Sequence, residues 1–231
     1  MEQLQGGYTL DLPKGTFPLG TDSMVLADFV RLPRSAQVLD LGAGGGTLGT
    51  LLCGRDPGCH VTGIEIDPLS HSAAVENIRR NHLEARMNSI CADLTQLPEF
   101  LDPGGFSVCI SNPPYFPGGP AAALTRARRE DSCTAEQLMS AAAWALKYGG
   151  DFFLVHRPER LAELIALGSK KNLEAKDLRL VRHRQDGPVS LILLHFRKGG
   201  KPGLNLDELA LFDSQGLPTE AHRRIYHHKE A

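Results

Sequence analysis

A tetrapeptide, Asn112-Pro113-Pro114-Tyr115, carries the most specific chemistry in the sequence. It directly follows residues 106–111, an apolar run that reads as a buried strand. Because a residue before proline is pushed into extended geometry, Asn112 and Pro113 hold their acceptor oxygens in fixed directions. The Asn112 side-chain oxygen and the Pro113 carbonyl can accept both hydrogens of a planar exocyclic amine, and Tyr115 offers a flat face for a base. The tetrapeptide is therefore the candidate catalytic site, although Asn-Pro-Pro is also good turn chemistry.

A glycine-rich turn lies between a predicted strand, residues 37–41, and a predicted helix, residues 47–52. Glycines in such a turn let a ligand approach the backbone and meet the positive end of the helix. Two motifs fit this turn. The dinucleotide fingerprint G-x-G-x-x-G would use Gly44, Gly46 and Gly49. The alternative, G-x-G-x-G preceded by an acid, would use Asp40, Gly42, Gly44 and Gly46.

Two acidic residues follow later predicted strands. Glu65 lies at the end of the strand predicted for residues 60–66, where an acid can accept hydrogen bonds from both hydroxyls of a ribose. Both cofactor motifs place an acid there, so Glu65 supports a nucleoside ligand without choosing between them. Asp93 comes just after the short strand predicted for residues 89–92. It is expected either to accept a hydrogen bond from an adenine amino group or to cap its own loop.

The elements that must position these residues follow from a regular alternation of strands and helices. The predicted strands are residues 37–41, 60–66, 89–92, 106–111, 152–155, 178–183 and 189–196. Helical patterns follow the first, second, fourth and fifth of these strands, and a turn at Asp186-Gly187-Pro188 joins the last two as an antiparallel pair. This order predicts an α/β fold with a mostly parallel sheet and helices on both faces.

The organisation of the chain follows from the same pattern. We expect an N-terminal segment with one helix over residues 1–36, a main domain over residues 37–200 and a C-terminal tail over residues 201–231. Within the first segment, Asp22 is expected to cap a helix that covers residues 23–30.

Composition places the protein in an ordinary class. The chain has 231 residues, 42% hydrophobic and 23% charged, with a net charge of −2. No apolar run is long enough to span a membrane, and the polar N-terminus does not resemble a signal peptide. Five cysteines form no CxxC pair, which predicts neither structural zinc nor disulfides. We therefore expect a cytoplasmic protein with no bound metal.

Charge is unevenly distributed along the chain. Residues 1–115 contain 7 Lys/Arg and 13 Asp/Glu, whereas residues 116–231 contain 18 and 14, so the net charges are −6 and +4. A polyanionic partner would meet the basic half. The alternative is a surface charge that is uneven without being functional.

Four motifs, VLDLGAGGGTLG, GIEIDP, CADL and SNPPY, occur in this order on consecutive predicted strands. Together they resemble the motifs of class I S-adenosylmethionine (SAM)-dependent methyltransferases that act on planar amines. The resemblance implies a Rossmann-like, seven-stranded, mostly parallel sheet with helices on both faces and an antiparallel last strand. It also implies SAM as the cofactor. The residues that it assigns to SAM are Asp40, Gly42, Ala43, Gly44, Gly46, Glu65, Ile66, Asp93, Leu94 and Asn112.

Segments outside these motifs indicate a branch of this group. Residues 17–28, the cluster Arg126-Ala-Arg-Arg-Glu130 and residues 197–200 resemble the tRNA1(Val) (adenine-N6)-methyltransferase family. The resemblance implies transfer of a methyl group to the exocyclic N6 of an adenine in tRNA, the adenosine just 3′ of the anticodon. It implies tRNA as the partner and no membrane, and we take a monomer as the default. The residues expected to contact the RNA are Tyr115, Arg126, Arg128 and Arg129.

Other functions remain open at this point. A protein-glutamine N5-methyltransferase acting on a translation factor shares the tetrapeptide, because an amide nitrogen is as delocalised as an adenine amine. Those enzymes carry a helical domain before the glycine motif, and the 36 residues before Gln37 are too few for it. A non-catalytic nucleic-acid-binding protein with a SAM pocket and a nicotinamide-dependent dehydrogenase are further alternatives. The sequence does not identify the tRNA or the base position.

Overall fold

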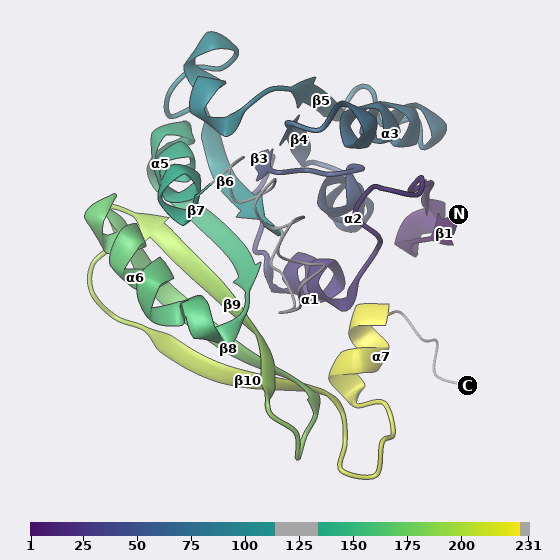
Figure 1. Cartoon of the computed structure of the whole chain (residues 1–231), viewed down its shortest axis with the longest axis vertical. Helices are drawn as coiled ribbons and strands as arrows, with labels where there is room; N and C mark the ends of the chain where they lie inside the picture. The colour runs from purple at the N-terminus through teal and green to yellow at the C-terminus, as the bar shows by residue number, and fades with distance from the viewer. Residues whose placement is uncertain (114–133, 227–231) are drawn as a thin grey trace.

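The computed structural model describes residues 1–113 and 134–226, which form one mixed sheet with helices on both faces (Figure 1). Its strand order is β10-β8-β9-β7-β6-β3-β4-β5. The strands are β3 (Gln37–Leu41), β4 (His60–Glu65), β5 (Met87–Cys91), β6 (Phe106–Ser111), β7 (Leu146–His156), β8 (Leu173–Arg184), β9 (Val189–Lys198) and β10 (Asn205–Phe212). The helices are α1 (Thr21–Phe29), α2 (Thr47–Arg55), α3 (Pro68–Arg80), α5 (Ala135–Ala145), α6 (Leu161–Lys170) and α7 (Glu220–Tyr226).

Strand direction confirms the expected mostly parallel sheet. Strands β5, β4, β3, β6 and β7 are parallel neighbours, while β9 runs antiparallel to both β7 and β8. The antiparallel strand is thus the second member of the hairpin that the sequence predicted. Helix α3 also begins as expected, because Asp67 accepts a hydrogen bond from the Ser70 N–H at 2.9 Å and Pro68 follows it.

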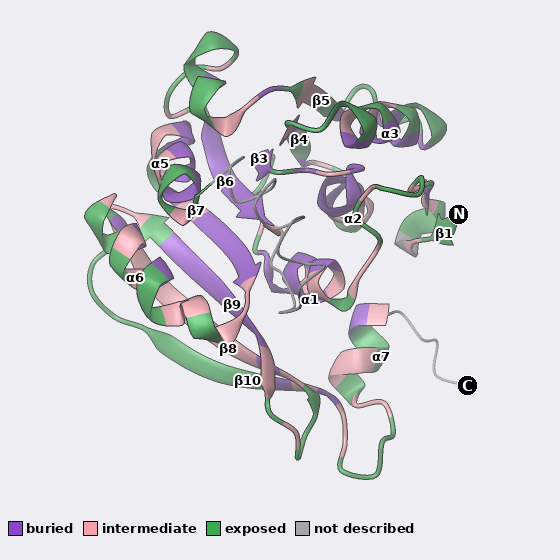
Figure 2. Ribbon diagram, in the orientation of Figure 1, coloured by how far each residue is buried: buried purple, intermediate pink, exposed green. Residues whose placement is uncertain are grey.

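The expected number of strands is wrong by one. Within the described residues the sheet has eight strands, since β10 pairs in parallel with β8 at the sheet edge. This strand comes from residues 201–231, which the sequence analysis treated as a tail. Its first half is exposed and polar, so it shows little of the apolar pattern of a buried strand (Figure 2). Pairing with β8 and burial of Leu209 and Leu211 in its second half together make it a strand.

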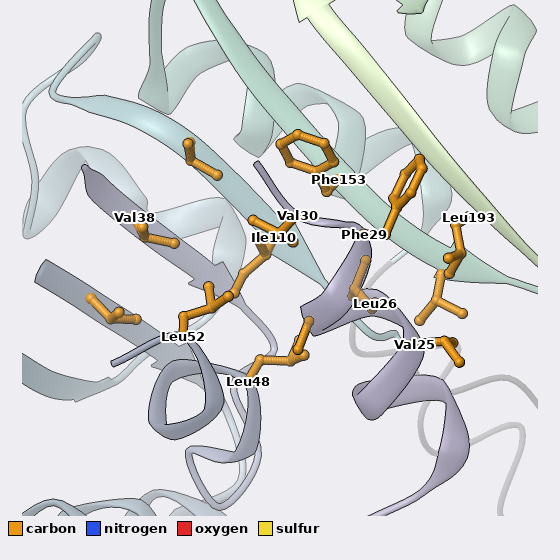
Figure 3. Close-up of a cluster of buried hydrophobic side chains, with 14 of the residues drawn as sticks. Val25, Leu26, Phe29, Val30, Val38, Leu48, Leu52, Ile110, Phe153 and Leu193 are labelled. Carbon is orange, nitrogen blue, oxygen red and sulfur yellow. The ribbon is translucent and has the colours of Figure 1, made fainter. Parts of the chain in front are cut away.

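Each face of the sheet carries its own hydrophobic cluster, because successive strand residues point to opposite sides. One cluster joins Val38, Ile110, Phe153 and Leu193 to helices α1 and α2 (Figure 3). Within it, the Phe29 ring of α1 meets Phe153 edge-on at 5.8 Å. The other cluster joins the alternate strand residues to α5 and α6. The sheet is therefore packed on both faces, and this packing holds the strand ends that carry the site residues in place.

Helix α1 begins earlier than expected. Its N-cap is Gly20, and Asp22 lies within the first turn, where its Oδ1 accepts a hydrogen bond from the adjacent Ser23 N–H at 2.8 Å. The expectation that Asp22 caps the helix is therefore wrong. The helix packs its buried side chains, Val25, Leu26 and Phe29, onto the sheet.

The N-terminal segment is held by two asparagines of the α3 region. Asn81 accepts a hydrogen bond from the Thr9 N–H at 2.8 Å and donates to the Thr9 carbonyl at 2.7 Å. Asn77 does the same with Asp11, at 2.8 and 3.1 Å. Strands β1 (Glu2–Gln3) and β2 (Thr9–Leu10) pair with each other alone. The amide side chains thus satisfy backbone groups of β2 and of the residue after it.

Candidate active site

The carboxyl ends of β3, β4, β5 and β6 lie at one edge of the sheet, because these strands are parallel neighbours. In open α/β sheets this edge is where ligands bind. The glycine turn, Glu65, Asp93 and Asn112 each follow one of these strands or lie at its end. The fold therefore brings together the described residues that the sequence proposed for cofactor and amine.

The glycine turn has the backbone geometry that only glycine adopts readily. Gly42, Gly44 and Gly46 have φ values of 79°, 56° and 81°. A Cβ at Gly42 or Gly44 would meet nothing within 4 Å, so the turn faces open space. Gly49 instead lies in α2, where a Cβ would come within 2.5 Å of the Met87 side chain. The positive φ at Gly42 fits the first glycine of G-x-G-x-G. The dinucleotide fingerprint would begin only at Gly44 and would leave this glycine unused.

Gly45, the additional glycine of the turn, lies against the N-terminal segment. A Cβ there would lie 2.4 Å from Cδ2 of Leu12, which belongs to the N-terminal segment. The Gly45 carbonyl also accepts a hydrogen bond from Nδ2 of Asn77 at 2.9 Å. The N-terminal segment is thus packed against the turn itself.

Glu65 joins the turn to the end of β4. Its Oε2 accepts a hydrogen bond from the Gly44 N–H and its Oε1 from the Asp67 N–H, both at 2.8 Å. The next residue, Ile66, is 46% exposed despite its apolar side chain. An acid that is half-buried beside an exposed aliphatic side chain is suited to the ribose and base of a nucleoside. The roles of Glu65 and Ile66 toward a ribose and a base stay predictions.

Asp93 caps its own loop. Its Oδ1 accepts hydrogen bonds from both the N–H and the hydroxyl of Thr95 at 2.7 Å, at the start of the 3-10 helix Leu94–Glu99. The capping alternative is therefore present in the structure. Contact with an adenine amino group stays a prediction, as does the role of the half-buried Leu94.

Asp40 is a buried carboxyl group whose pKa is strongly raised. The side chain is completely buried at the end of β3, and neither carboxylate oxygen has a hydrogen-bond partner in the described part of the chain. Burial raises the pKa of Asp40 to about 8, and the negative charge of Glu65 adds to the rise. A buried carboxylate without a partner is costly, which points to a ligand that supplies a cation or donors.

Asn112 presents a second unpaired group. Its Nδ2 donates a hydrogen bond to the Ser23 hydroxyl at 3.0 Å, whereas its buried Oδ1 has no partner among the described residues. The preceding Ser111 donates to the Leu41 carbonyl at 2.7 Å and so ties β6 to β3 beside the glycine turn. Ser23 was not singled out from the sequence, because it lies 89 residues from Asn112 and its type alone gives no signal.

Part of the proposed site lies outside the described residues. These positions are Pro114, Tyr115, Arg126, Arg128 and Arg129. Pro113 is described and half-buried. Within the described ranges no group of three His, Cys, Asp or Glu side chains could hold a metal ion. None of the helices described is both long and apolar enough to cross a bilayer.

Sequence comparison adds independent information to this geometry. The family described as "Methyltransferase small domain" matches residues 18–170. A tRNA1(Val) (adenine(37)-N6)-methyltransferase from Dickeya chrysanthemi is 30% identical over 192 residues, which cover 81% of this chain and 75% of that protein. A protein of the same name from Shewanella sp. is 30% identical over 210 residues, or 88% and 87% of the two chains.

Solved structures agree on the fold. A protein described as a predicted O-methyltransferase from Agrobacterium tumefaciens has a TM-score of 0.76 at 22% identity, over 90% of this chain and 96% of its own. The 16S rRNA N2 methyltransferase of T. thermophilus, solved in complex with AdoMet and guanosine, has a TM-score of 0.58 at 25% identity, over 80% and 45%. The site geometry, the family match and these relatives together support SAM as the cofactor. The chain belongs to the methyltransferase small-domain family, and within it to the family of the tRNA1(Val) (adenine(37)-N6)-methyltransferases.

Proposed function

We propose that this protein transfers the methyl group of SAM to the exocyclic N6 of an adenine in tRNA. The observation that carries the proposal is the buried Oδ1 of Asn112, which lies just after β6 beside the glycine turn and has no hydrogen-bond partner among the described residues. An unpaired buried acceptor calls for a donor, and an exocyclic amine supplies two N–H groups. The names of the relatives support the same substrate class.

The residues at the sheet edge fit SAM. SAM, when bound, supplies a methyl group activated by a neighbouring sulfonium. We assign its cationic amino acid portion to the neighbourhood of Asp40 and the glycine turn, where a buried carboxylate lacks a partner and a Cβ would meet open space. We assign the ribose to Glu65 and the base to the exposed face of Ile66, with Asp93 and Leu94 at the far side.

The residues of β6 act on the amine. The lone pair of an adenine amine is delocalised into the ring, which makes it a weak nucleophile. Acceptors at Asn112 Oδ1 and the Pro113 carbonyl, directed out of the ring plane, would favour a pyramidal nitrogen whose lone pair is available. Holding this nitrogen in line with the methyl group contributes several kcal/mol by proximity. The base must leave its stack, at a cost of about a few kcal/mol that is smaller in a single-stranded loop.

The finer proposal concerns the target nucleotide. The relatives' names specify adenine 37 of tRNA1(Val), and we propose the same substrate for this chain. Methyl transfer from tritiated SAM to total tRNA, followed by nucleoside analysis and mapping of the modified position, tests it. N6-methyladenosine at that position supports the proposal. In a parallel reaction with a translation factor, label in a glutamine side chain and none in tRNA would favour the alternative substrate. Label on a different tRNA adenine would keep the reaction and change only the proposed position.

Contacts to the RNA backbone are assigned to Arg126, Arg128 and Arg129. The described arginines of β8 support this choice, since Arg179 pairs with Asp207 at 2.6 Å and is partly neutralised. Arg182 and Arg184 are likewise paired with acids. An alanine triple variant should raise the tRNA KM and flatten the salt dependence of tRNA binding by about 0.7 to 0.9 per lost phosphate contact. An unchanged slope would assign RNA binding to other basic residues.

A further inference from the structure

We propose that Ser23 is a positioning residue for catalysis, which holds the Asn112 amide so that Oδ1 faces the amine to be methylated. The inference rests on the proposed function, in which Asn112 Oδ1 accepts a hydrogen bond from the substrate. Its structural basis is one contact, from Asn112 Nδ2 to the Ser23 hydroxyl at 3.0 Å. The serine comes from α1, far from the motifs that define the site in the sequence.

A primary amide has two different ends, and only one can accept a hydrogen bond. Rotation of the Asn112 side chain by half a turn would exchange Oδ1 and Nδ2 and present donors to an amine that needs acceptors. In the structure the Nδ2 end is occupied by Ser23, while the buried Oδ1 end has no partner in the described residues. With its Nδ2 end held by the Ser23 hydroxyl, the Asn112 amide leaves its Oδ1 end available to the amine.

The position of Ser23 is itself fixed by packing. Its side chain is 4% exposed, and the same helix buries Val25, Leu26 and Phe29 against the sheet. Figure 3 shows the Phe29 ring between Phe153 and Leu193 in this cluster. Because α1 cannot shift without disturbing this cluster, the serine hydroxyl is held at a set place. A preorganised partner loses little free energy to reorganisation when the substrate binds.

The test compares Ser23→Ala with Ser107→Ala, a second buried serine whose hydroxyl hydrogen-bonds the Gln37 backbone away from the site. With saturating SAM and tRNA, Ser23→Ala should lower kcat about tenfold to a hundredfold, with SAM affinity and tRNA KM unchanged. Ser107→Ala should keep its kcat. In an Asn112→Ala background, Ser23→Ala should cause no further loss, because the group that it positions is gone. An unchanged kcat, or an additive loss, would overturn the inference.

Two further measurements keep the outcomes distinct. If Ser23→Ala does not fold, Ser23→Cys retains the packing but replaces the hydroxyl with a weak acceptor, and should also lower kcat. Nuclear magnetic resonance of the Asn112 side-chain NH2 needs no activity. Ser23→Ala should shift its resonances and speed its hydrogen exchange, whereas unchanged resonances would refute the contact. If the wild type transfers no methyl group to tRNA, the proposed function fails. The resonances of the Asn112 side-chain NH2 then still show whether Ser23 contacts Asn112.

Discussion

Two groups of buried polar side chains differ in one respect that separates ligand binding from structural support. At the carboxyl edge of β3 and β6, the oxygens of Asp40 and Oδ1 of Asn112 lack partners within the described residues. Across β7, β8 and β9, His195 is also buried, yet its Nδ1 lies 2.5 Å from Asp177 Oδ2 and its Nε2 lies 2.7 Å from Asp151 Oδ1. Among the described residues, the first group lacks partners that a ligand could supply, whereas the second completes itself.

The two groups also shift carboxylate pKa values in opposite directions. Burial raises the pKa of Asp40, the nearby charge of Glu65 adds to the rise, and the Gly49 backbone N–H offsets only part of it. Burial acts on Asp151 as well, but hydrogen bonds from His195 and Arg197 outweigh it and hold its pKa below the usual value. The same holds for Asp177, through His195, Asn205 and Arg31. Buried carboxylates therefore indicate a binding site only where their partners are missing.

The largest expected effect is on the pH dependence of stability at Asp40. The folded protein keeps Asp40 protonated up to about pH 8, whereas the unfolded chain releases this proton near the ordinary aspartate pKa of 3.8. The contribution of Asp40 to stability therefore falls as pH rises through this window, by at most about 6 kcal/mol. In ligand-free protein, Asp40→Asn should gain stability relative to the wild type as pH increases. Urea unfolding at pH 5, 6.5 and 8 measures the difference.

Asp177→Asn is the control for that experiment, because its lowered pKa gives the opposite sign. The stability that its carboxylate contributes is present above the unfolded pKa and is lost as pH falls through the folded value. The free energy of unfolding of the variant should therefore be lower than that of the wild type at pH 6.5, and the difference should disappear in acid. If the stability of both variants, relative to the wild type, changed with pH in the same direction, the distinction between the Asp40 group and the His195 group would be wrong.

Asn112→Ala should abolish most of the activity without affecting the cofactor. Loss of one preorganised group at the reacting centre costs on the order of 100- to 1,000-fold in kcat. SAM affinity, measured by calorimetry, should remain within about threefold, since the lost acceptor acts on the amine. A variant that keeps wild-type kcat would refute the role of Oδ1.

His195→Ala should damage stability and spare the chemistry. It leaves Asp151 and Asp177 without the group between them, which should cost about 3 kcal/mol in the free energy of unfolding. Methyl transfer per folded molecule should be unchanged. The His195 ring contacts Asp151, Asp177 and Phe153, none of which we assign to the cofactor or the amine. His60→Ala, at an exposed position, serves as the control. Loss of activity in a folded His195→Ala protein would contradict a purely structural role.

The smallest effect is expected at the ion pair between α7 and α1. Arg224 donates to Asp28 through two nitrogens, at 3.2 and 3.0 Å, but its side chain is 56% exposed. Pairs in contact with water contribute about 1 kcal/mol or less. Arg224→Ala should lower the Tm by no more than about 4 °C in a calorimetric scan. A greater loss would show that α7 stabilises α1 by more than this pair.

Much of the site is a local property of the sequence. The strand before each motif, the positive φ values of the glycine turn and the Asp67-Pro68 helix start all depend on a few adjacent residues. Local backbone preference determined these features, so sequence patterns predicted them.

Only the tertiary structure decided which distant side chains meet. Ser23 reaches Asn112 across 89 residues, and Leu12 packs against Gly45. Strand β10 joins the sheet by pairing with β8, and His195 meets Asp177 and Asp151 on adjacent strands. Each of these contacts depends on strand order, register and helix packing. None leaves a periodic signal in the chain, because the free energy that fixes them comes from close packing and pairing between segments that are remote in sequence.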